Sequence, residues 1–527
     1  MLRVTKPLLS LLIVVVVTGG VPSSGRAQAA EAETPKEVRT GIELIRRGRY
    51  DEAVDRFQVA IEKSPQSRAA RLGLSWAYLK QRQFPPSVEQ ALKVLESDPE
   101  NARAHALIGA ALMRVGVLPE ATVAFQRALK SDPNEPLALA GVAELDMYAG
   151  DLRLSVQHAQ SAVSRSPREP DFLYLLGQSA ARQERFDVAA DAYDRYLSVA
   201  PDVDSDRRAR IRGLVQLYRR LSGRNLYLVG GNRTVDVPIS LTDSRLPVID
   251  VMVNGKGPFR FVIDSGAGFV VVSEEIARKL KIRPVAAGGT SRGVSGTGRF
   301  NIVYGVIDRL EIGTVSVESI PTYIRKVLDP GKQHIDGYVG LSVLSNFKVS
   351  VDYEHRVLEM RPKDAVFEPI GEDDVVVPYR MTNGGMMSIS VDIGKEVPLN
   401  FIVDTGASST VVSRRAFDKF DLAAKQHKGV GVRVVGAGGV TENAPVIVLD
   451  KLMINGSPNV QEFVRAIVLD LDPINEPAGF EQGGIIGSDL LRLYRVEFDF
   501  DRGTVVLRPN SRRAESAPVT HVPEAVH

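Results

Sequence analysis

The sequence predicts a multidomain protein, in which an N-terminal α-helical solenoid precedes an all-β part built from two related lobes. Two observations carry this prediction. Prolines recur every 34 residues in the first part of the chain, and a short Asp-centred motif occurs twice in the second part. A chain of 527 residues is also too long for one hydrophobic core, so several domains are expected.

Residues 1–29 have the pattern of a secretory signal peptide. Arg3 and Lys6 supply positive charge, an apolar run from Leu8 to Val17 follows, and Ala27-Gln28-Ala29 places small residues at a cleavage site. The apolar run is shorter than the roughly 20 residues that span a bilayer, so cleavage is favoured over a retained anchor. The sequence therefore predicts an exported protein, periplasmic or secreted.

Composition excludes several classes of site. The chain has no Cys, which excludes disulfides, thiol nucleophiles and Cys-based metal sites. Its 7 His show no His-Glu-x-x-His pair, and no Gly-x-x-x-x-Gly-Lys-Ser/Thr loop occurs, so neither a metal nor another cofactor is expected. Loss of residues 1–29 would turn the formal charge of +2 into −1, which leaves no basic excess for nucleic acid.

Residues 34–201 carry a helical repeat with fixed positions for small and aromatic residues. In the first repeat these are Gly41, Ala53 and Phe57, and the third and fifth repeats keep the pattern. It resembles the tetratricopeptide repeat (TPR), in which small residues lie where paired helices touch and Pro ends the second helix. The resemblance implies a groove that binds a peptide or protein. The period is marked by Pro65, Pro99, Pro133, Pro167 and Pro201.

The remaining boundaries follow from composition. Asp202 to Leu221 is expected to form a charged closing helix, so the repeat domain is assigned to residues 30–222. The Gly-rich segment 223–236 is interpreted as a linker. Residues 510–527 lack apolar periodicity and are expected to be disordered.

The second half contains two copies of one motif, Phe261-Val-Ile-Asp264-Ser-Gly-Ala and Phe401-Ile-Val-Asp404-Thr-Gly-Ala. The copies are offset by 140 residues here and by 147 residues further on. In each, an apolar strand delivers one Asp, and a carboxylate at the end of a buried strand is costly unless it is used or paired. Two such carboxylates can be each other's partner. The duplication predicts two lobes, residues 237–365 and 366–509.

This order of features resembles the aspartic proteases of the retropepsin type, with two lobes fused in one chain as in pepsin-like enzymes. The resemblance implies an endopeptidase in which Asp264 and Asp404 form a catalytic pair that activates water. It also implies two hairpin flaps, at 288–298 and 429–439, that close over an extended peptide. The residues expected to shape and support the two Asp loops are Ser265, Gly266, Thr405, Gly406, Gly340 and Gly487.

Other interpretations remain open from the sequence. One is a non-enzymatic TPR scaffold with a degenerate protease-like domain, and another lets each lobe pair with a lobe of a second chain. Asp352 and Asp499 also repeat, but they precede turn residues and are interpreted as structural hairpin acids. Substrate, cleavage preference, pH optimum and TPR partner are not specified by the sequence.

Overall fold

The computed structural model describes residues 35–511 except 232, 297, 328–332, 396 and 457–459. The expected signal peptide, and all but the first two residues of the expected disordered tail, lie outside the described residues. Within the described part of the chain, no helix is long and apolar enough to cross a membrane. By their contacts the residues divide into two compact units. The helical unit runs to Asp146 and includes Arg153–Ser179 and Arg195–Asp204; the β-rich unit contains Met147–Leu152, Ala180–Asp194 and Ser205 onward.

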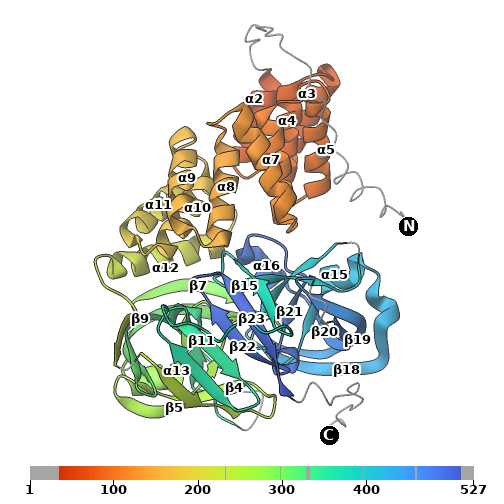
Figure 1. Cartoon of the computed structure of the whole chain (residues 1–527). Coiled ribbons are helices and arrows are strands. Elements are labelled where there is room, and N and C mark those ends of the chain that lie inside the picture. The colour runs from red at the N-terminus through yellow and green to blue at the C-terminus, as the bar shows by residue number, and fades with distance from the viewer. Residues whose placement is uncertain are drawn as a thin grey trace. The chain divides into compact units, whose positions relative to one another are not determined.

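The N-terminal part consists of successive helices of similar length (Figure 1). Two of them begin at a side-chain cap two residues after a repeat proline, where Ser67 accepts from the Ala70 amide and Asn101 from the Ala104 amide. The predicted repeats are therefore helical. The helices are α2 Lys36–Arg46, α3 Tyr50–Lys63, α4 Arg68–Lys80, α5 Phe84–Leu95, α6 Ala102–Arg114, α7 Leu118–Ser131, α8 Pro136–Ala149, α9 Leu152–Arg165, α10 Pro170–Arg182, α11 Phe186–Val199 and α12 Ser205–Leu221.

Aromatic rings lie between glycines of neighbouring helices in the helical unit. The buried ring of Phe57 on α3 faces both Gly41 on α2 and Gly73 on α4, where an added Cβ would come within 2.7 Å and 2.5 Å of Phe57 Cζ. Phe125 stands in the same relation to Gly109 and to a glycine of α8. The glycine positions of the repeat are thus those at which a helix backbone meets an aromatic ring.

In the second repeat, a serine replaces the small apolar residue at the contact between the paired helices. Ser87, where the first, third and fifth repeats have Ala, donates to the Ser75 carbonyl at 2.8 Å, while Ser75 donates to the Ser87 carbonyl at 2.7 Å. Both side chains are fully buried. Because each hydroxyl is satisfied, the substitution is compatible with helix packing.

Most strands of the first β-rich lobe form one sheet in the order β1-β9-β6-β10-β5-β4-β8-β7, with β3 pairing β4, and the others belong to a sheet shared with the second lobe. Its strands are β1 Leu228–Gly231, β2 Val235–Pro238, β3 Ser240–Leu241, β4 Pro247–Val253, β5 Lys256–Ile263, β6 Val270–Ser273, β7 Ala286–Arg292, β8 Arg299–Ile312, β9 Val315–Arg325, β10 Gly337–Val339, β11 Lys348–Asp352 and β12 Val357–Arg361. Two short helices accompany them, α13 Glu274–Lys279 and α14 Leu341–Leu344.

The second lobe repeats this arrangement in the order β14-β15-β16-β21-β17-β20-β19-β18. Its strands are β13 Val375–Pro378, β14 Arg380–Met381, β15 Met387–Asp392, β16 Leu399–Val403, β17 Val411–Ser413, β18 Gln426–Gly436, β19 Gly439–Ile454, β20 Val460–Leu469, β21 Gly484–Ile486, β22 Tyr494–Asp499 and β23 Thr504–Pro509. Its helices are α15 Arg414–Lys419, the 3₁₀ helix η1 Leu422–Lys425, α16 Asp472–Ala478 and α17 Ser488–Leu491.

A third sheet joins the lobes in the order β13-β23-β22-β11-β12-β2. Its central pair is antiparallel, with Val349 opposite Phe498 and Val351 opposite Val496. Val496 corresponds to Val349 by the 147-residue offset, and Phe498 corresponds to Val351. Val349 therefore pairs with the counterpart of Val351, and Val351 pairs with the counterpart of Val349. This reciprocal pairing places a pseudo-twofold axis between β11 and β22. The two lobes pair within one chain.

Helix α12 and the segment after it group with the β-rich unit. Gly213 of α12 lies against the backbone of β7, where an added Cβ would be 2.5 Å from Gly288 Cα. Arg210 donates to the Thr290 carbonyl at 3.3 Å, and Asp206 pairs with Arg299. The segment 223–236, interpreted as a linker, contains β1, which extends the first sheet beside β9. Gly230 and Gly231 therefore belong to a strand at the sheet edge, and Gly231 lies close to the backbone of the turn at Thr314.

Candidate active site

Asp264 and Asp404 lie in equivalent loops, each directly after a buried strand, β5 or β16. Their carboxyl groups lie close enough for the pKa of each to depend on the other. A Cβ on Gly266 would lie 2.5 Å from Asp404 Oδ1, and a Cβ on Gly406 would lie 2.6 Å from Asp264 Oδ1. Glycine at these two positions is what allows each loop to approach the carboxyl of the other lobe.

Ser265 and Thr405 link the two loops by reciprocal hydrogen bonds. The Ser265 amide donates to Thr405 Oγ1 and the Thr405 amide donates to Ser265 Oγ, both at 3.0 Å. The hydroxyls in turn donate across the contact, from Ser265 to the Val403 carbonyl at 2.8 Å and from Thr405 to the Ile263 carbonyl at 2.7 Å. Both side chains are buried, so these four bonds fix the separation of the two aspartates.

The two carboxyls are electrostatically unequal. Burial raises the pKa of Asp264, whereas the guanidinium of Arg325 and the loop amide of Gly266 oppose that shift. Burial also raises the pKa of Asp404, here well above its usual range, and the adjacent Asp264 raises it further. Two carboxyls this close titrate as a pair, and the guanidinium of Arg325 makes the surroundings of the two unequal.

Two support turns hold the loops from behind. The amide of Asp264 donates to the Val339 carbonyl and that of Asp404 to the Ile486 carbonyl, both at 3.0 Å. Gly340 and Gly487 follow these carbonyls and begin α14 and α17. A side chain at either glycine would collide with backbone of the Asp loop, because an added Cβ on Gly340 would lie 2.6 Å from a carbonyl oxygen of that loop.

The two flap-like hairpins are present and their tips contact each other. They are formed by β7 with β8 and by β18 with β19. The Gly298 amide donates to the Gly438 carbonyl at 2.8 Å, and the Gly438 amide donates to the Val294 carbonyl at 3.1 Å. Ser295 Oγ donates to the Val434 carbonyl at 2.7 Å. The tips therefore form one hydrogen-bonded bridge.

The first flap tip and the second Asp loop both pack on an apolar cluster of the second lobe. Val294 of the tip and Ala407 of the loop both pack against one apolar cluster that includes Leu469 and Ile485. This cluster gives the second lobe an apolar wall between flap and loop.

Asp352 and Asp499 lie outside this arrangement, at hairpin turns of the joining sheet. Asp352 accepts from the His355 amide at 2.8 Å, and Asp499 accepts from the Arg502 amide at 3.1 Å. Asp499 also forms an ion pair with Lys348 at 3.4 Å. Both carboxylates order turns, which supports their interpretation as structural acids.

Two features of the site were not foreseen from the sequence. Asp489 accepts from the amide and the hydroxyl of Thr410, at 2.9 and 2.8 Å, and so connects α17 to the second Asp loop. Arg325, at the end of β9, acts on Asp264. The internal repeat gives no signal for the Asp489–Thr410 pair, because the first-lobe counterparts of these residues are Ser342 and Val270.

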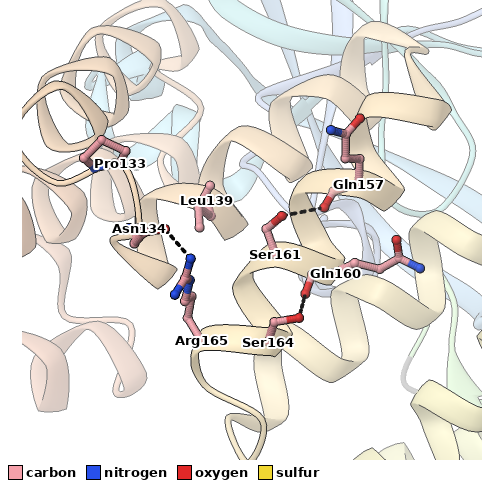
Figure 2. A pocket seen from close by; sticks show the side chains of 8 residues that line it. All are labelled: Pro133, Asn134, Leu139, Gln157, Gln160, Ser161, Ser164 and Arg165. Atoms are coloured by element: carbon pink, nitrogen blue, oxygen red, sulfur yellow. Dashed lines mark hydrogen bonds between the residues drawn. The ribbon is translucent and has the colours of Figure 1, made fainter.

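A separate pocket of about 370 Å³ lies in the helical unit between α8 and α9 (Figure 2). Arg165 donates to Asn134 Oδ1 at 2.5 Å, and the hydroxyls of Ser161 and Ser164 donate to backbone carbonyls one turn earlier. The lining is polar and carries no acid–base pair. In the described part of the chain, no group of three His, Asp or Glu side chains could hold a metal ion.

Comparison with known families defines the class of this chain. Residues 249–343 and 389–490 match the family model described as aspartyl protease. Residues 44–111 and 143–204 match two models described as tetratricopeptide repeat. The chain therefore carries an aspartyl protease-like domain in two segments, preceded by TPRs, and the predicted fold class is confirmed. No curated protein matches the chain.

Solved structures resemble this chain only in part. A thermophilic TPR protein from Thermus thermophilus is 20% identical over 35% of this chain and 96% of its own, with a TM-score of 0.29. Basic 7S globulin from soybean is 14% identical over 54% of this chain and 97% of its own, with a TM-score of 0.33. Conglutin gamma from lupine seeds is 14% identical over 54% of this chain and 96% of its own, with a TM-score of 0.32.

Proposed function

We propose that this protein is an aspartic-type endopeptidase whose catalytic pair is Asp264 and Asp404. The observation that carries the proposal is the close approach of two partly buried carboxyls, related by a pseudo-twofold axis and braced by Ser265 and Thr405. Two such carboxyls share one proton, because like charges in contact do not both ionise readily. One ionised and one protonated carboxyl supply the base and the acid that peptide hydrolysis needs.

The surroundings support different roles for the two aspartates in this proposal. Arg325 favours the ionised form of Asp264, whereas burial and the neighbouring charge favour the protonated form of Asp404. Asp264 is therefore the base that takes a proton from water, and Asp404 is the acid that donates to the scissile carbonyl oxygen. The water oxygen attacks the carbonyl carbon and gives a tetrahedral diol. Proton transfer from Asp264 to the amide nitrogen then breaks the C–N bond, and Asp404 recovers its proton from the diol.

The flaps and the repeats would select the substrate. The bridge between the two flap tips must open to admit a peptide and can close again above it, which excludes water from the reacting groups. The TPR part would dock the substrate or a partner protein, and the polar pocket between α8 and α9 is one surface available for this. Binding of an unfolded protein to the Asp404→Asn variant, with and without residues 30–204, tests the docking role: equal affinity for both forms would refute it.

The catalytic proposal is tested by replacing each aspartate with the isosteric amide. We expect Asp264→Asn and Asp404→Asn each to lower the cleavage rate of an unfolded protein by about 10²–10⁴-fold or more, and the double variant to add little. The matched control is Asp250→Asn, the same chemical change at an exposed position of β4. Cleavage products are quantified by mass spectrometry with and without an inhibitor of the pepstatin type.

The result also separates the enzyme from the scaffold alternative. Absence of cleavage by the folded wild-type protein, across acidic and neutral pH, would favour a non-enzymatic TPR scaffold. Cleavage that persists in Asp404→Asn at the wild-type rate would exclude the assigned pair.

We also propose that the protein is exported to the periplasm or secreted. The support is the signal-like pattern of residues 1–29. The mature chain should then begin at Ala30, which N-terminal mass spectrometry of the protein from its native source checks. An intact Met1 or Leu2 in the mature protein would refute export by this signal.

A further inference from the structure

Arg325 breaks the symmetry between the two lobes at a position next to the aspartates. It is the last residue of β9 and lies in register with Ser273 of β6. The equivalent pair in the second lobe is Ser413 of β17 with Leu469 of β20. A long cation in one lobe therefore occupies the place that a buried aliphatic side chain occupies in the other.

The guanidinium of Arg325 lies between two aromatic rings from separate parts of the site. Its Cζ is 5.4 Å from the centre of the Phe300 ring and 5.6 Å from that of Tyr338. Phe300 belongs to β8, one residue from the start of that flap strand, and Tyr338 belongs to β10, which leads to the support turn at Gly340. Arg325 thus lies between the base of the first flap tip and the strand beneath the Asp264 loop.

This guanidinium has an unused hydrogen-bond donor. Nε of Arg325 is buried and has no acceptor among the residues that the structure describes. No ion pair joins Arg325 to a described acid, although the guanidinium is close enough to Asp264 to attract its charge. Removing a charged donor from water without giving it an acceptor is costly, and a ligand that brings an anionic acceptor recovers that cost. The rings hold the cation in position by cation–π attraction, and the Arg325 side chain remains partly exposed, so that a ligand can reach it.

The equivalent place in the second lobe has the opposite chemistry. Leu469 packs with Ile485, the counterpart of Tyr338, in an apolar cluster that also contacts Ala407 of the second Asp loop. The two sides of the aspartate pair are therefore lined differently, one by a cation between aromatic rings and the other by aliphatic side chains. A peptide lying across both aspartates would meet the cation on one side and, on the other, the partly exposed Ala407 and Val294 that pack on this cluster.

We infer that Arg325 forms a subsite for a carboxylate of the peptide substrate, so that the enzyme selects peptides with an acidic group on one side of the scissile bond and an apolar side chain on the other. This inference rests on the proposed endopeptidase function. The carboxylate comes either from an Asp or Glu side chain or from the C-terminus of a short peptide. Arg325 is a specificity-determining residue, since its contact is with the substrate and not with the bond that is broken.

The first test measures kcat/KM for matched peptides. One set of fluorogenic peptides carries Glu, Gln or Leu at each position within three residues of the scissile bond, and a second set ends in a free carboxylate or an amide at the same distances. We expect wild type to prefer Glu over Gln, or carboxylate over amide, by about tenfold or more at one position, the ratio for one charge-assisted hydrogen bond. Which set shows the preference identifies the source of the carboxylate.

Three variants make the test specific. Arg325→Leu copies the residue at position 469 and should reduce the preference to about one, whereas Arg325→Lys should retain part of it through charge alone. Lys326→Leu removes the same charge from the neighbouring, exposed side chain and should keep the full wild-type ratio. Equal Glu-to-Gln ratios in wild type and Arg325→Leu, or loss of the ratio in Lys326→Leu, would overturn the inference. Because the readout is a ratio within each variant, a general loss of activity does not imitate the expected result.

A binding measurement separates this inference from the proposed function. The Asp404→Asn protein retains Arg325, and its affinity for the same labelled peptides is measured by fluorescence anisotropy, alone and with Arg325→Leu added. Selective binding of the acidic peptide that depends on Arg325, without cleavage by wild type, would support the subsite and reject the endopeptidase. Cleavage without selectivity would support the endopeptidase and reject the subsite. Neither cleavage nor selectivity would reject both.

Discussion

Thr405 and Ser265 hold the two lobes together at the aspartate pair through buried hydroxyls. Thr405 Oγ1 accepts from the Ser265 amide and donates to the Ile263 carbonyl, so one side chain satisfies two buried backbone groups of the other lobe. Thr405→Ala would leave both groups without a partner. Since each unsatisfied buried group costs about 1–3 kcal/mol, we expect the free energy of unfolding to fall by about 2 kcal/mol or more. Chemical denaturation of the β-rich unit followed by circular dichroism measures it.

Thr405→Ser is the matched control for this change. It keeps the hydroxyl and removes only a methyl group, so its unfolding free energy should lie within about 1 kcal/mol of wild type. If Thr405→Ala and Thr405→Ser were equally stable, the hydrogen bonds would not be what joins the lobes.

Asp404 predicts a dependence of stability on pH with a defined sign. Its pKa in the folded protein is raised well above the ordinary 3.8 by burial and then by Asp264. A carboxyl with a raised folded-state pKa contributes stability below the unfolded-state pKa and loses it as pH rises through the folded-state pKa. At neutral pH the ionised form is therefore unfavourable, and Asp404→Asn removes it.

We expect Asp404→Asn to raise Tm relative to wild type at neutral pH, with a difference that shrinks as pH falls and disappears below the ordinary pKa of 3.8. Thermal unfolding at several values between about pH 3 and pH 8 provides the measurement. Asp250→Asn, on an exposed strand position, should show no such trend. A Tm difference for Asp404→Asn that grows toward low pH would contradict the raised pKa.

At the scale of secondary-structure elements, the flap bridge depends on the absence of side chains at its tips. A Cβ on Gly438 would lie 2.5 Å from the Gly293 carbonyl oxygen. Gly438→Ala should therefore separate the tips, weaken the bonds that Gly438 makes with Gly298 and Val294, and speed amide hydrogen exchange at these residues by about tenfold or more. Hydrogen exchange with mass spectrometry of both flap peptides reports this directly.

Val440→Ala is the control for the flap experiment. Its side chain is 38% exposed and lies two residues from Gly438, so its truncation leaves the bridge intact. Unchanged exchange in Gly438→Ala, or equal acceleration in Val440→Ala, would show that the tips are not joined in solution.

The sequence predicted elements better than it predicted contacts between them. Repeated glycines gave the hairpins, the support turns and the Asp loops, because each of these has a local backbone requirement that glycine satisfies. The positions of Asp264 and Asp404 followed from their repetition, and their contact was expected from a twofold relation. Those features are copied in both lobes and so are visible as a repeat.

Features present in one lobe only were missed for the same reason. Arg325 in the first lobe corresponds to Leu469 in the second, so the repeat gives no signal for the arginine. The grouping of α12 with the β-rich unit was also missed, because Gly213 looks like any repeat glycine until β7 is placed beside it. Contacts that depend on tertiary packing between unrelated elements leave no periodic trace in the sequence.

At the scale of the whole molecule, α12 makes the boundary between the two parts testable. The sequence places the boundary at residue 222, whereas the contacts of Asp206, Arg210 and Gly213 group α12 with β7. We expect a fragment of residues 205–511 to have a Tm at least about 2 °C above that of residues 223–511, because the shorter fragment exposes the face of β7 that α12 covers. Differential scanning calorimetry of the two fragments compares them.

Two point variants in α12 separate the effect of its contacts with β7 from the effect of fragment length. Gly213→Ala in the longer fragment should lower its Tm toward that of the shorter one, since the added methyl meets backbone atoms of β7. Gln216→Ala, on the exposed side of α12, should leave it unchanged. Equal Tm values for both fragments would show that α12 does not stabilise the β-rich unit and would favour a boundary at residue 222.

The joining sheet also determines when the active site can exist during synthesis. β23, Thr504–Pro509, pairs with β13 and β22, and the support turn beneath Asp404 includes Ile486 and Gly487. A ribosome makes Asp264 and Asp404 well before it makes these residues, and at roughly 5–20 residues per second that interval lasts seconds. Throughout it both aspartates are present but unsupported. If the proposed function holds, a truncated or still-attached chain is expected to be inert, and the proposed peptidase activity would first appear when the last strand is released.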